Sequence, residues 1–273
     1  MKNKNRFHFT LLFLFCVKIG FSQSPWVNPK GSSYTQLSTT FLSYNSVFNE
    51  EGSVNETDFS TSDMTIGLFG DYSLSNKLAV TINFPIKFVE FNGEELSGLG
   101  DPKIRFKYQI SGHKPLTVYA GYTAPLSERT GPLRTGYNQH ALELGLSKGF
   151  SKNDYYGYGS LGYRYRTNIA DQILIGGEIG ASISAFNRPL FLIFNLNGAF
   201  NLSTEEDDDA ANSVLYHNNS EYLSPGLKIS YNIFDHFWIN AGGAGAFQAK
   251  NAGAAPTLSI GIAYNIKKHG ETN

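Results

Sequence analysis

Residues 257–266 read TLSIGIAYNI, and every second side chain in this stretch is large and apolar. The apolar positions are the even ones, from Leu258 to Ile266, whereas the odd positions hold Thr, Ser, Gly, Ala and Asn. A period of two residues is typical of a β-strand that has one apolar face. A strand of about ten residues crosses a bilayer when it is tilted by about 45°. The stretch therefore predicts a membrane-spanning strand.

The same alternation recurs along most of the chain upstream of this stretch. In residues 190–202, for example, Leu and Phe dominate one face while Asn recurs on the other. Turn-forming residues separate the alternating segments from one another. Counted in this way, the sequence contains about twelve strands, at residues 32–45, 59–73, 77–89, 101–111, 115–125, 139–150, 155–166, 172–186, 190–202, 221–233, 237–247 and 257–266.

The connections between the predicted strands alternate in length. Tight turns fall at residues 75–76, 112–114, 152–154, 187–189 and 234–236, and longer loops fall at 46–58, 90–100, 126–138, 167–171, 203–220 and 248–256. Outer-membrane barrels have short periplasmic turns and long extracellular loops. The sequence therefore predicts an all-β fold, a transmembrane antiparallel up-and-down β-barrel of about twelve strands with periplasmic termini, over residues 31–273.

The composition agrees with a barrel and excludes several other classes. Charged residues make up only 16% of the chain, aromatic residues make up 14%, and there are 28 glycines. A soluble globular domain carries roughly 25% charged residues. The mean hydropathy is −0.24, and after the first 22 residues the sequence has no apolar run long enough to cross a membrane as a helix. A net charge of −1 argues against a nucleic-acid partner.

A soluble β-sandwich or jelly roll is the alternative, because its strands alternate as well. Its polar face would meet water and would carry many Lys, Glu and Asp side chains. Here the polar face holds mainly Gly, Ser, Asn and Ala. Small neutral side chains suit a narrow lumen better than a solvated surface, which favours the membrane barrel.

The first 22 residues have the three regions of a secretory signal. Basic Lys2, Lys4 and Arg6 precede the apolar residues 9–17, and small residues lie before Gln23. We expect cleavage after residue 22, which leaves residues 23–30 as a short periplasmic segment. A lipoprotein anchor at Cys16 is disfavoured because the bulky Phe15 precedes the cysteine.

Export followed by membrane insertion defines the expected surroundings of the barrel. These are the lipids and lipopolysaccharide of the outer membrane, reached with the help of the barrel assembly machinery. The acidic run 205–209 in a long loop predicts a solvated loop, with binding of a divalent cation as the alternative.

Charged residues on the predicted lumen face are the main candidates for a functional site. They are Lys87, Lys103, Arg105, Lys107, Glu143, Arg164, Glu178 and Lys228, with Asp63 and Asp71 nearby. One hypothesis is that opposite charges pair across the strands and hold the barrel wall together. The other is that the basic residues of strand 101–111 form a filter that favours anionic solutes. The sequence leaves both hypotheses open.

The sequence offers few candidates for catalytic residues. A barrel lipid hydrolase needs Ser, His and an orienting group on its outer face, but Leu142 is the next residue on the face of His140, and the run 216–220 lies in a loop. No Cys/His metal spacing occurs after the signal. We therefore expect no enzyme and no cofactor, with a lipid hydrolase as the less favoured alternative. Residues Tyr155, Tyr156, Tyr158, Tyr163 and Tyr165 suggest an aromatic girdle at the membrane interface.

The stretch Gly98-Leu99-Gly100-Asp101-Pro102, running into Lys107-Tyr108, carries a family resemblance. Residues 119–125, a Tyr-Ala-Gly-Tyr strand ending in Pro, and the strand that begins near His140 extend it. Over residues 77–165 the chain resembles the outer-membrane barrels of the meta-pathway phenol-degradation transporter family. The resemblance implies a channel that passes small, hydrophobic or aromatic solutes into the periplasm.

The resemblance also gives roles to a rim motif formed by Gly98, Gly100 and Asp101. The two glycines are expected to allow a tight approach with positive φ, and Asp101 is expected to cap the turn or to pair with a rim cation. One departure is that the chain continues to residue 273 after the last strand, whereas many such barrels end on an aromatic residue.

The expected width leaves two functions open. Barrels of eight strands are filled by side chains and barrels of sixteen hold water, so about twelve strands give a narrow path that a few long side chains can block. We therefore expect a channel or transporter for small solutes, with a structural or adhesin-like barrel as the alternative.

Overall fold

A computed structural model describes residues 24–111, 115–130, 133–203 and 217–268. The predicted export signal and the acidic run 205–209 lie outside these residues. The described part of the chain contains no helix that is long and apolar enough to cross a membrane.

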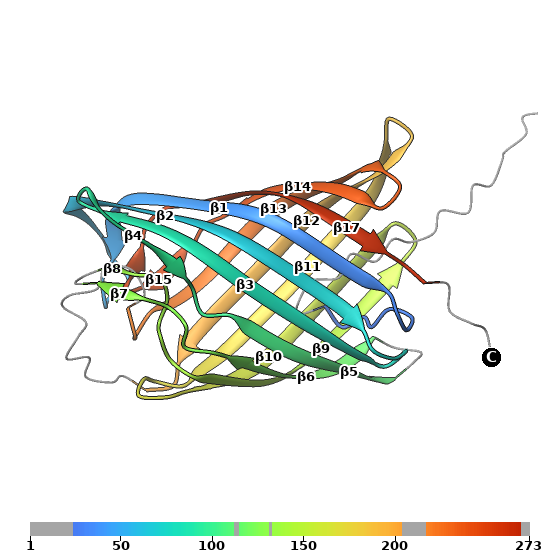
Figure 1. The fold of residues 1–273 in the computed structure, drawn as a ribbon, viewed down its shortest axis with the longest axis horizontal. Helices are drawn as coiled ribbons and strands as arrows, with labels where there is room; N and C mark the ends of the chain where they lie inside the picture. Colours follow the sequence, from blue (N-terminus) through green and yellow to red (C-terminus); the bar gives the residue numbers. More distant parts are fainter. Residues whose placement is uncertain (1–23, 112–114, 131–132, 204–216, 269–273) are drawn as a thin grey trace, which may run out of the picture.

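Twelve long strands form a closed antiparallel barrel (Figure 1). They are β1 (Ser33–Phe48), β2 (Val54–Ser73), β3 (Leu78–Phe91), β5 (Lys103–Ser111), β6 (Leu116–Thr123), β9 (Ala141–Lys152), β10 (Tyr155–Arg166), β11 (Gln172–Ala185), β12 (Arg188–Asn201), β13 (Glu221–Phe234), β14 (Phe237–Ala244) and β17 (Thr257–Ile266). Each strand pairs with its neighbour in sequence, and β1 pairs with β17 from Ser33↔Ile266 to Phe41↔Leu258, which closes the barrel. The predicted fold class is confirmed.

One end of the barrel carries the short turns, and the other end carries the longer connections. Near the short-turn end lie the beginning of β1 and the end of β17 (Figure 1). Four further pieces, all at the long-loop end, are β4 (Glu94–Leu99), the hairpin of β7 (Arg129–Thr130) and β8 (Leu133–Arg134), β15 (Gln248–Lys250) and β16 (Ala252–Gly253). In outer-membrane barrels the end with short turns is periplasmic.

Several predicted loops are partly strand. The loop expected at 46–58 is reduced to residues 49–53, because β1 and β2 continue past a register shift between Tyr44 and Ser46. The loop expected at 90–100 is a hairpin of β3 and β4, which turns at Asn92 and Gly93 with φ of 51° and 85°. Positive φ at both central residues is the geometry of a tight two-residue hairpin. These strands extend because pairing satisfies backbone groups that an irregular loop would leave to water.

The facing of the strands follows the alternation in the sequence. On β17 the even residues are exposed, with Leu258 and Ile260 each at 62%, whereas Ala263 is 3% exposed. Similar rows of exposed Leu, Ile, Phe and Tyr side chains surround the barrel on its other strands. A closed barrel with an apolar outer face satisfies its backbone groups internally and presents hydrocarbon to lipid.

This facing predicts unequal effects of the same charge on neighbouring residues of β17. We expect Ile260→Arg to lower the free energy of unfolding by about 2–4 kcal/mol in a bilayer, because its guanidinium would enter hydrocarbon. We expect Ser259→Arg to lower it less, since its side chain faces the lumen. Urea unfolding of the barrel in vesicles measures both values, and equal losses would contradict the assigned facing.

Candidate functional site

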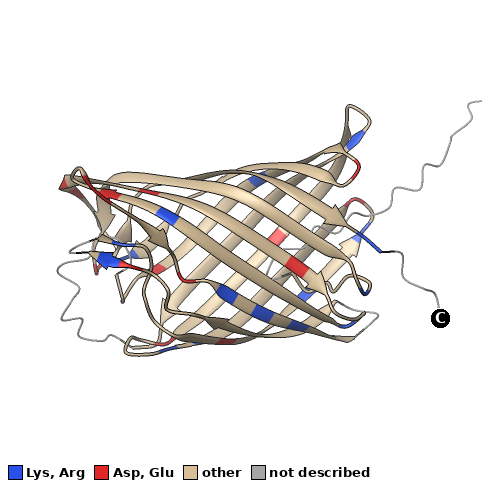
Figure 2. Ribbon diagram, viewed as in Figure 1, with Lys and Arg blue, Asp and Glu red and all other residues tan. Residues whose placement is uncertain are grey.

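Basic residues follow one another along β5 (Figure 2). Their side chains form ion pairs with carboxylates on other strands. Lys107 Nζ lies 2.6 Å from Asp71 Oδ2 on β2, and Arg105 Nη2 lies 2.6 Å from Glu143 Oε2 on β9. Both pairs reach over one intervening strand rather than between direct neighbours. Between Arg105 and Glu143 lies Gly121 of β6, whose lack of a side chain leaves the path open.

Glu143 is the centre of this charged network. Its Oε1 atom accepts hydrogen bonds from Lys103 Nζ at 2.7 Å and from Arg164 Nε at 2.8 Å. Arg164 Nη2 also lies 2.7 Å from Oε1. A single carboxylate on β9 therefore joins two cations of β5 and one of β10. In a site sheltered from water such charge-assisted hydrogen bonds are strong and hold the wall rigid.

Tyr119 on β6 lies beside this network, and two glycines make its position possible. The guanidinium carbon of Arg105 lies 4.5 Å from the centre of the Tyr119 ring. A Cβ atom on Gly145 or Gly162 would overlap the hydroxyl end of Tyr119. The end of the ring therefore occupies the space beside these two glycines, where a larger residue would displace it.

The remaining predicted lumen charges are also held in contacts. Lys87 Nζ lies 2.8 Å from Asp63 Oδ2. Glu178 Oε1 accepts a hydrogen bond of 2.6 Å from the hydroxyl of Tyr156, and its carboxylate interacts electrostatically with Lys228. The structure thus brings the predicted residues together as wall pairs, the first of the two arrangements that the sequence left open.

The rim motif is a point of close packing. A Cβ atom on Gly100 would lie 2.9 Å from Pro85 Cγ, and one on Gly98 would lie 2.8 Å from the carboxyl carbon of Glu128. Neither glycine has positive φ, so that expectation was wrong. Gly100 is required here because a Cβ would meet the rigid Pro85 ring and the Thr135 backbone, whereas at Gly98 the flexible Glu128 side chain could move aside.

Asp101 anchors the connection between β6 and β9. Its Oδ1 accepts a hydrogen bond from the backbone of Ser127 at 3.0 Å, and its Oδ2 accepts one from the backbone of Asn138 at 3.0 Å. Thr135 Oγ1 donates to the carbonyl of Leu99 at 2.5 Å. Both ends of the β7–β8 connection are thereby held against the segment that leads into β5.

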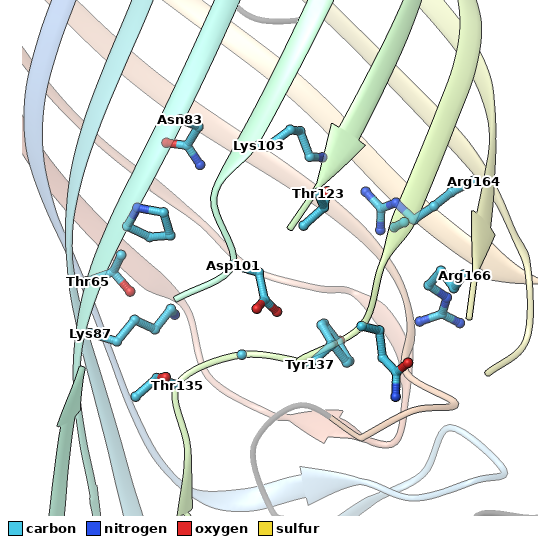
Figure 3. A pocket seen from close by; sticks show the side chains of 14 residues that line it. Thr65, Asn83, Lys87, Asp101, Lys103, Thr123, Thr135, Tyr137, Arg164 and Arg166 are labelled. Atoms are coloured by element: carbon cyan, nitrogen blue, oxygen red, sulfur yellow. The ribbon is translucent and has the colours of Figure 1, made fainter. Parts of the chain in front are cut away.

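A cavity of about 360 Å³ lies beneath this connection, at the long-loop end of the lumen (Figure 3). Its lining includes Lys87, Asp101, Lys103, Tyr137, Arg164 and Arg166. The cavity therefore joins the rim motif to the Glu143 network. The sequence predicted the charged residues but not Tyr137 or Arg166, which enter because the β6–β9 connection folds inward and because β10 ends there.

The short-turn end of the lumen is filled by aromatic side chains. A buried cluster forms from residues of four strands, with Phe69 and Tyr156 packed against it; its members are Tyr34, Phe191, Ile193, Trp238 and Ala263. The ring centres of Phe191 and Trp238 are 5.8 Å apart, and those of Tyr156 and Phe191 are 6.2 Å apart. We call these seven residues the aromatic layer. The alternation in the sequence did not predict this layer, since it indicated mainly small neutral residues in the lumen.

The segment that precedes β1 packs against this filled end from inside. The carbonyl of Pro25 accepts a 2.5 Å hydrogen bond from Thr117 Oγ1, and the Trp26 ring makes an edge contact with Tyr156 at 5.9 Å. Trp26 is 7% exposed, and the backbone of Val27 donates to Gln109 Oε1 at 3.1 Å. The segment expected to be a short periplasmic stretch therefore packs inside the lumen at the short-turn end, where its Trp and Pro find an apolar surface.

The tyrosines of β10 divide between two faces. Tyr155 and Tyr165 are exposed on the outer face at 61% and 48%. Tyr156 and Tyr158 instead point inward, and both rings contact Trp26. The expected single girdle was wrong for these two residues. The sequence carried the signal for this division, because even-numbered and odd-numbered residues of a strand face opposite sides of the sheet.

The residues considered for hydrolysis lie at the long-loop end. His140 Nδ1 is 2.7 Å from the hydroxyl of Tyr122, with the two rings stacked. Ser220 Oγ donates to the carbonyls of His217 and Asn251 at 2.7 Å and 2.6 Å. The Ser220 hydroxyl is thus engaged with backbone carbonyls, as in a structural turn.

Comparison with known proteins supports the fold. Neither a protein-family model nor a curated protein sequence matches the chain. The fold is similar to that of an outer-membrane channel from Pseudomonas putida F1, with a TM-score of 0.66 and 14% identity over 92% of this chain and 100% of the other. The translocator domain of the autotransporter NalP from Neisseria meningitidis aligns with a TM-score of 0.51 and 10% identity, over 88% and 90% of the two chains.

A third structure, the KdgM porin in complex with disordered oligogalacturonate, aligns with a TM-score of 0.47 and 7% identity, over 85% and 99% of the two chains. The first two likenesses show the outer-membrane β-barrel fold. Together with the apolar outer face, they place this chain in the outer membrane.

Proposed function

We propose that this chain is an outer-membrane channel for small solutes, narrowed at its short-turn end by the aromatic layer and the segment 24–30. The observation that carries the proposal is the unequal filling of the lumen. A cavity of about 360 Å³ lies at one end, and a layer held by ring contacts lies at the other. The segment that enters the filled end is attached by a few hydrogen bonds and ring contacts.

The solute class follows from what lines the path. Rings of the aromatic layer favour a compact solute with an apolar or aromatic part, because such a solute makes contacts with them that water does not. The likeness in fold to the Pseudomonas putida channel supports a conducting barrel. The residues Gly98 to Tyr108 support the resemblance to the phenol-degradation transporters, which implies solutes of the same kind.

Conductance and uptake test this proposal together. The refolded barrel should give small, discrete currents in planar bilayers, since the aromatic layer leaves only a narrow path. Uptake of neutral solutes into liposomes should fall steeply as the solutes become larger. Vesicles without protein serve as the control. A barrel that passes neither ions nor small aromatic solutes would contradict the proposal and leave a structural barrel as the better description.

A further inference from the structure

We infer that the cavity at the long-loop end is a binding site for a small carboxylate anion with a compact apolar body. The inference rests on the proposed function in placing this site at the outer entrance of the channel. The binding itself does not require that solutes pass through the barrel. Three features of the cavity lead to this assignment: its charge, its walls and its access.

The charge comes from two cations that share one carboxylate. Lys103 and Arg164 both contact Oε1 of Glu143, at 2.7 Å each, and both line the cavity. One carboxylate carries a single negative charge and cannot neutralise both of them. Glu143 also contacts Arg105, which leaves it still less able to balance the two lining cations. A second anion in the cavity would complete the pairing.

Access distinguishes the two lining cations from the rest of the network. The side chains of Lys103 and Arg164 are 25% and 23% exposed, whereas those of Arg105 and Glu143 are 3% and 0% exposed. The exposed fractions of Lys103 and Arg164 remain available to an anion that enters from the long-loop end. In Figure 3 both side chains project toward the cavity, Lys103 from β5 and Arg164 from β10.

The walls around these cations fit a carboxylate with a body rather than a bare inorganic ion. Pro85, the ring of Tyr137 and Ala141 line the cavity with apolar surface, and Asn83 and Thr123 add neutral polar groups. The volume of about 360 Å³ lies at the small end of the range for organic ligand sites. An Arg guanidinium beside a Lys ammonium suits a carboxylate, because both cations donate charge-assisted hydrogen bonds to its oxygens.

The acidic residue that lines the cavity, Asp101, keeps its negative charge, but the four basic residues of the lining outnumber it. Both oxygens of Asp101 accept backbone hydrogen bonds, from Ser127 and Asn138. Its role is to hold the connection that forms the roof. Lys87, on the far wall, is paired with Asp63 and contributes a further lining cation whose charge is balanced.

Binding of benzoate to the refolded full-length barrel tests this inference. Calorimetric titration, with empty detergent micelles subtracted, should show benzoate binding and much weaker binding of benzyl alcohol, which has a similar body without the charge. The double variant Lys103→Gln/Arg164→Gln should weaken benzoate binding by about tenfold or more. It leaves the Arg105–Glu143 pair in place. Lys77→Gln/Lys152→Gln, at two exposed lysines of the short-turn end, is the matched loss of two charges and should bind benzoate normally.

The other outcomes each overturn the inference. Equal binding of benzoate and benzyl alcohol, or unchanged binding in the double variant, would show that the two cations do not recognise the ligand. Binding of inorganic phosphate in preference to benzoate would show a general anion site. If the double variant does not fold, Ala141→Trp fills the cavity without changing its charge, and retention of benzoate by that variant would place binding elsewhere. Conductance without benzoate binding would reject this site and leave the channel intact.

Discussion

Removal of residues 24–30 should raise the single-channel conductance of the barrel several-fold. These residues bring Pro25 and Trp26 into the lumen, where Trp26 closes the space beside Tyr156 and Tyr158. A chain that begins at Gly31 keeps the hydrogen bond from Gly31 to the carbonyl of Ser73, so β1 stays anchored. The opened space would admit water and ions to the part of the lumen that the segment now fills.

Two point variants sharpen this prediction. Trp26→Ala should raise conductance in the same direction but less, because Pro25 and the hydrogen bond from Thr117 remain. Phe237→Ala removes an aromatic ring at the same end of the barrel from the outer face, where its side chain is 38% exposed, and should leave conductance unchanged. Recordings in planar bilayers compare all four proteins. An unchanged current in the deletion would mean that the aromatic layer alone sets the resistance.

Replacement of Glu143 by Gln should lower the free energy of unfolding. Breaking a buried ion pair costs about 3–5 kcal/mol, and we expect a loss at the lower end of this range. The carboxylate contacts Lys103, Arg105 and Arg164, and its loss leaves three cations facing one another beside an amide. Mutual repulsion and lost charge-assisted hydrogen bonds both act against the folded barrel. The partial exposure of Lys103 and Arg164 to water is what reduces the effect.

A surface pair provides the matched control for Glu143. Glu221 lies 3.3 Å from Lys250, whose side chain is 46% exposed at the long-loop end. Glu221→Gln should therefore change the free energy of unfolding by about 1 kcal/mol or less. Urea unfolding in vesicles, followed by tryptophan fluorescence, measures both variants. Similar losses at Glu143 and Glu221 would show that the Glu143 network does not stabilise the wall.

The sequence predicted the strands well because lipid imposes a simple rule. The outward residues of every strand must be apolar, so the alternation in stretches such as 257–266 marks both the strand and its facing. The turns were predictable for the same reason, since each falls where the alternation stops. Four of the five predicted tight turns and the twelve predicted strands agree with the structure to within a few residues, and the turn predicted at 112–114 lies outside the described residues.

The residues that fill the lumen were harder to predict. Outward residues all face lipid and must be apolar, but inward residues can face water, ions or other side chains, so their type follows no single rule. Phe191 and Ile193 are apolar residues on the inward face of β12. The alternation shows which face they lie on, but it does not show which residues of other strands they contact. Trp26 lies before the first strand, where alternation carries no information. The pairing of Glu143 with β5 depends on register across β6, which the sequence does not contain.

The aromatic layer crosses the seam at which the barrel closes. Trp238 on β14 and Ala263 on β17 are already partners in one strand pair, but Tyr34 on β1 joins them only when the first and last strands pair. Pairing Ser33 with Ile266 joins positions at opposite ends of the sequence, a contact of very high order that forms late. An intermediate with an open seam would leave these side chains exposed to water. Burial of the layer therefore stabilises the barrel only when the seam closes. Closure is then cooperative, and a half-open barrel is sparsely populated.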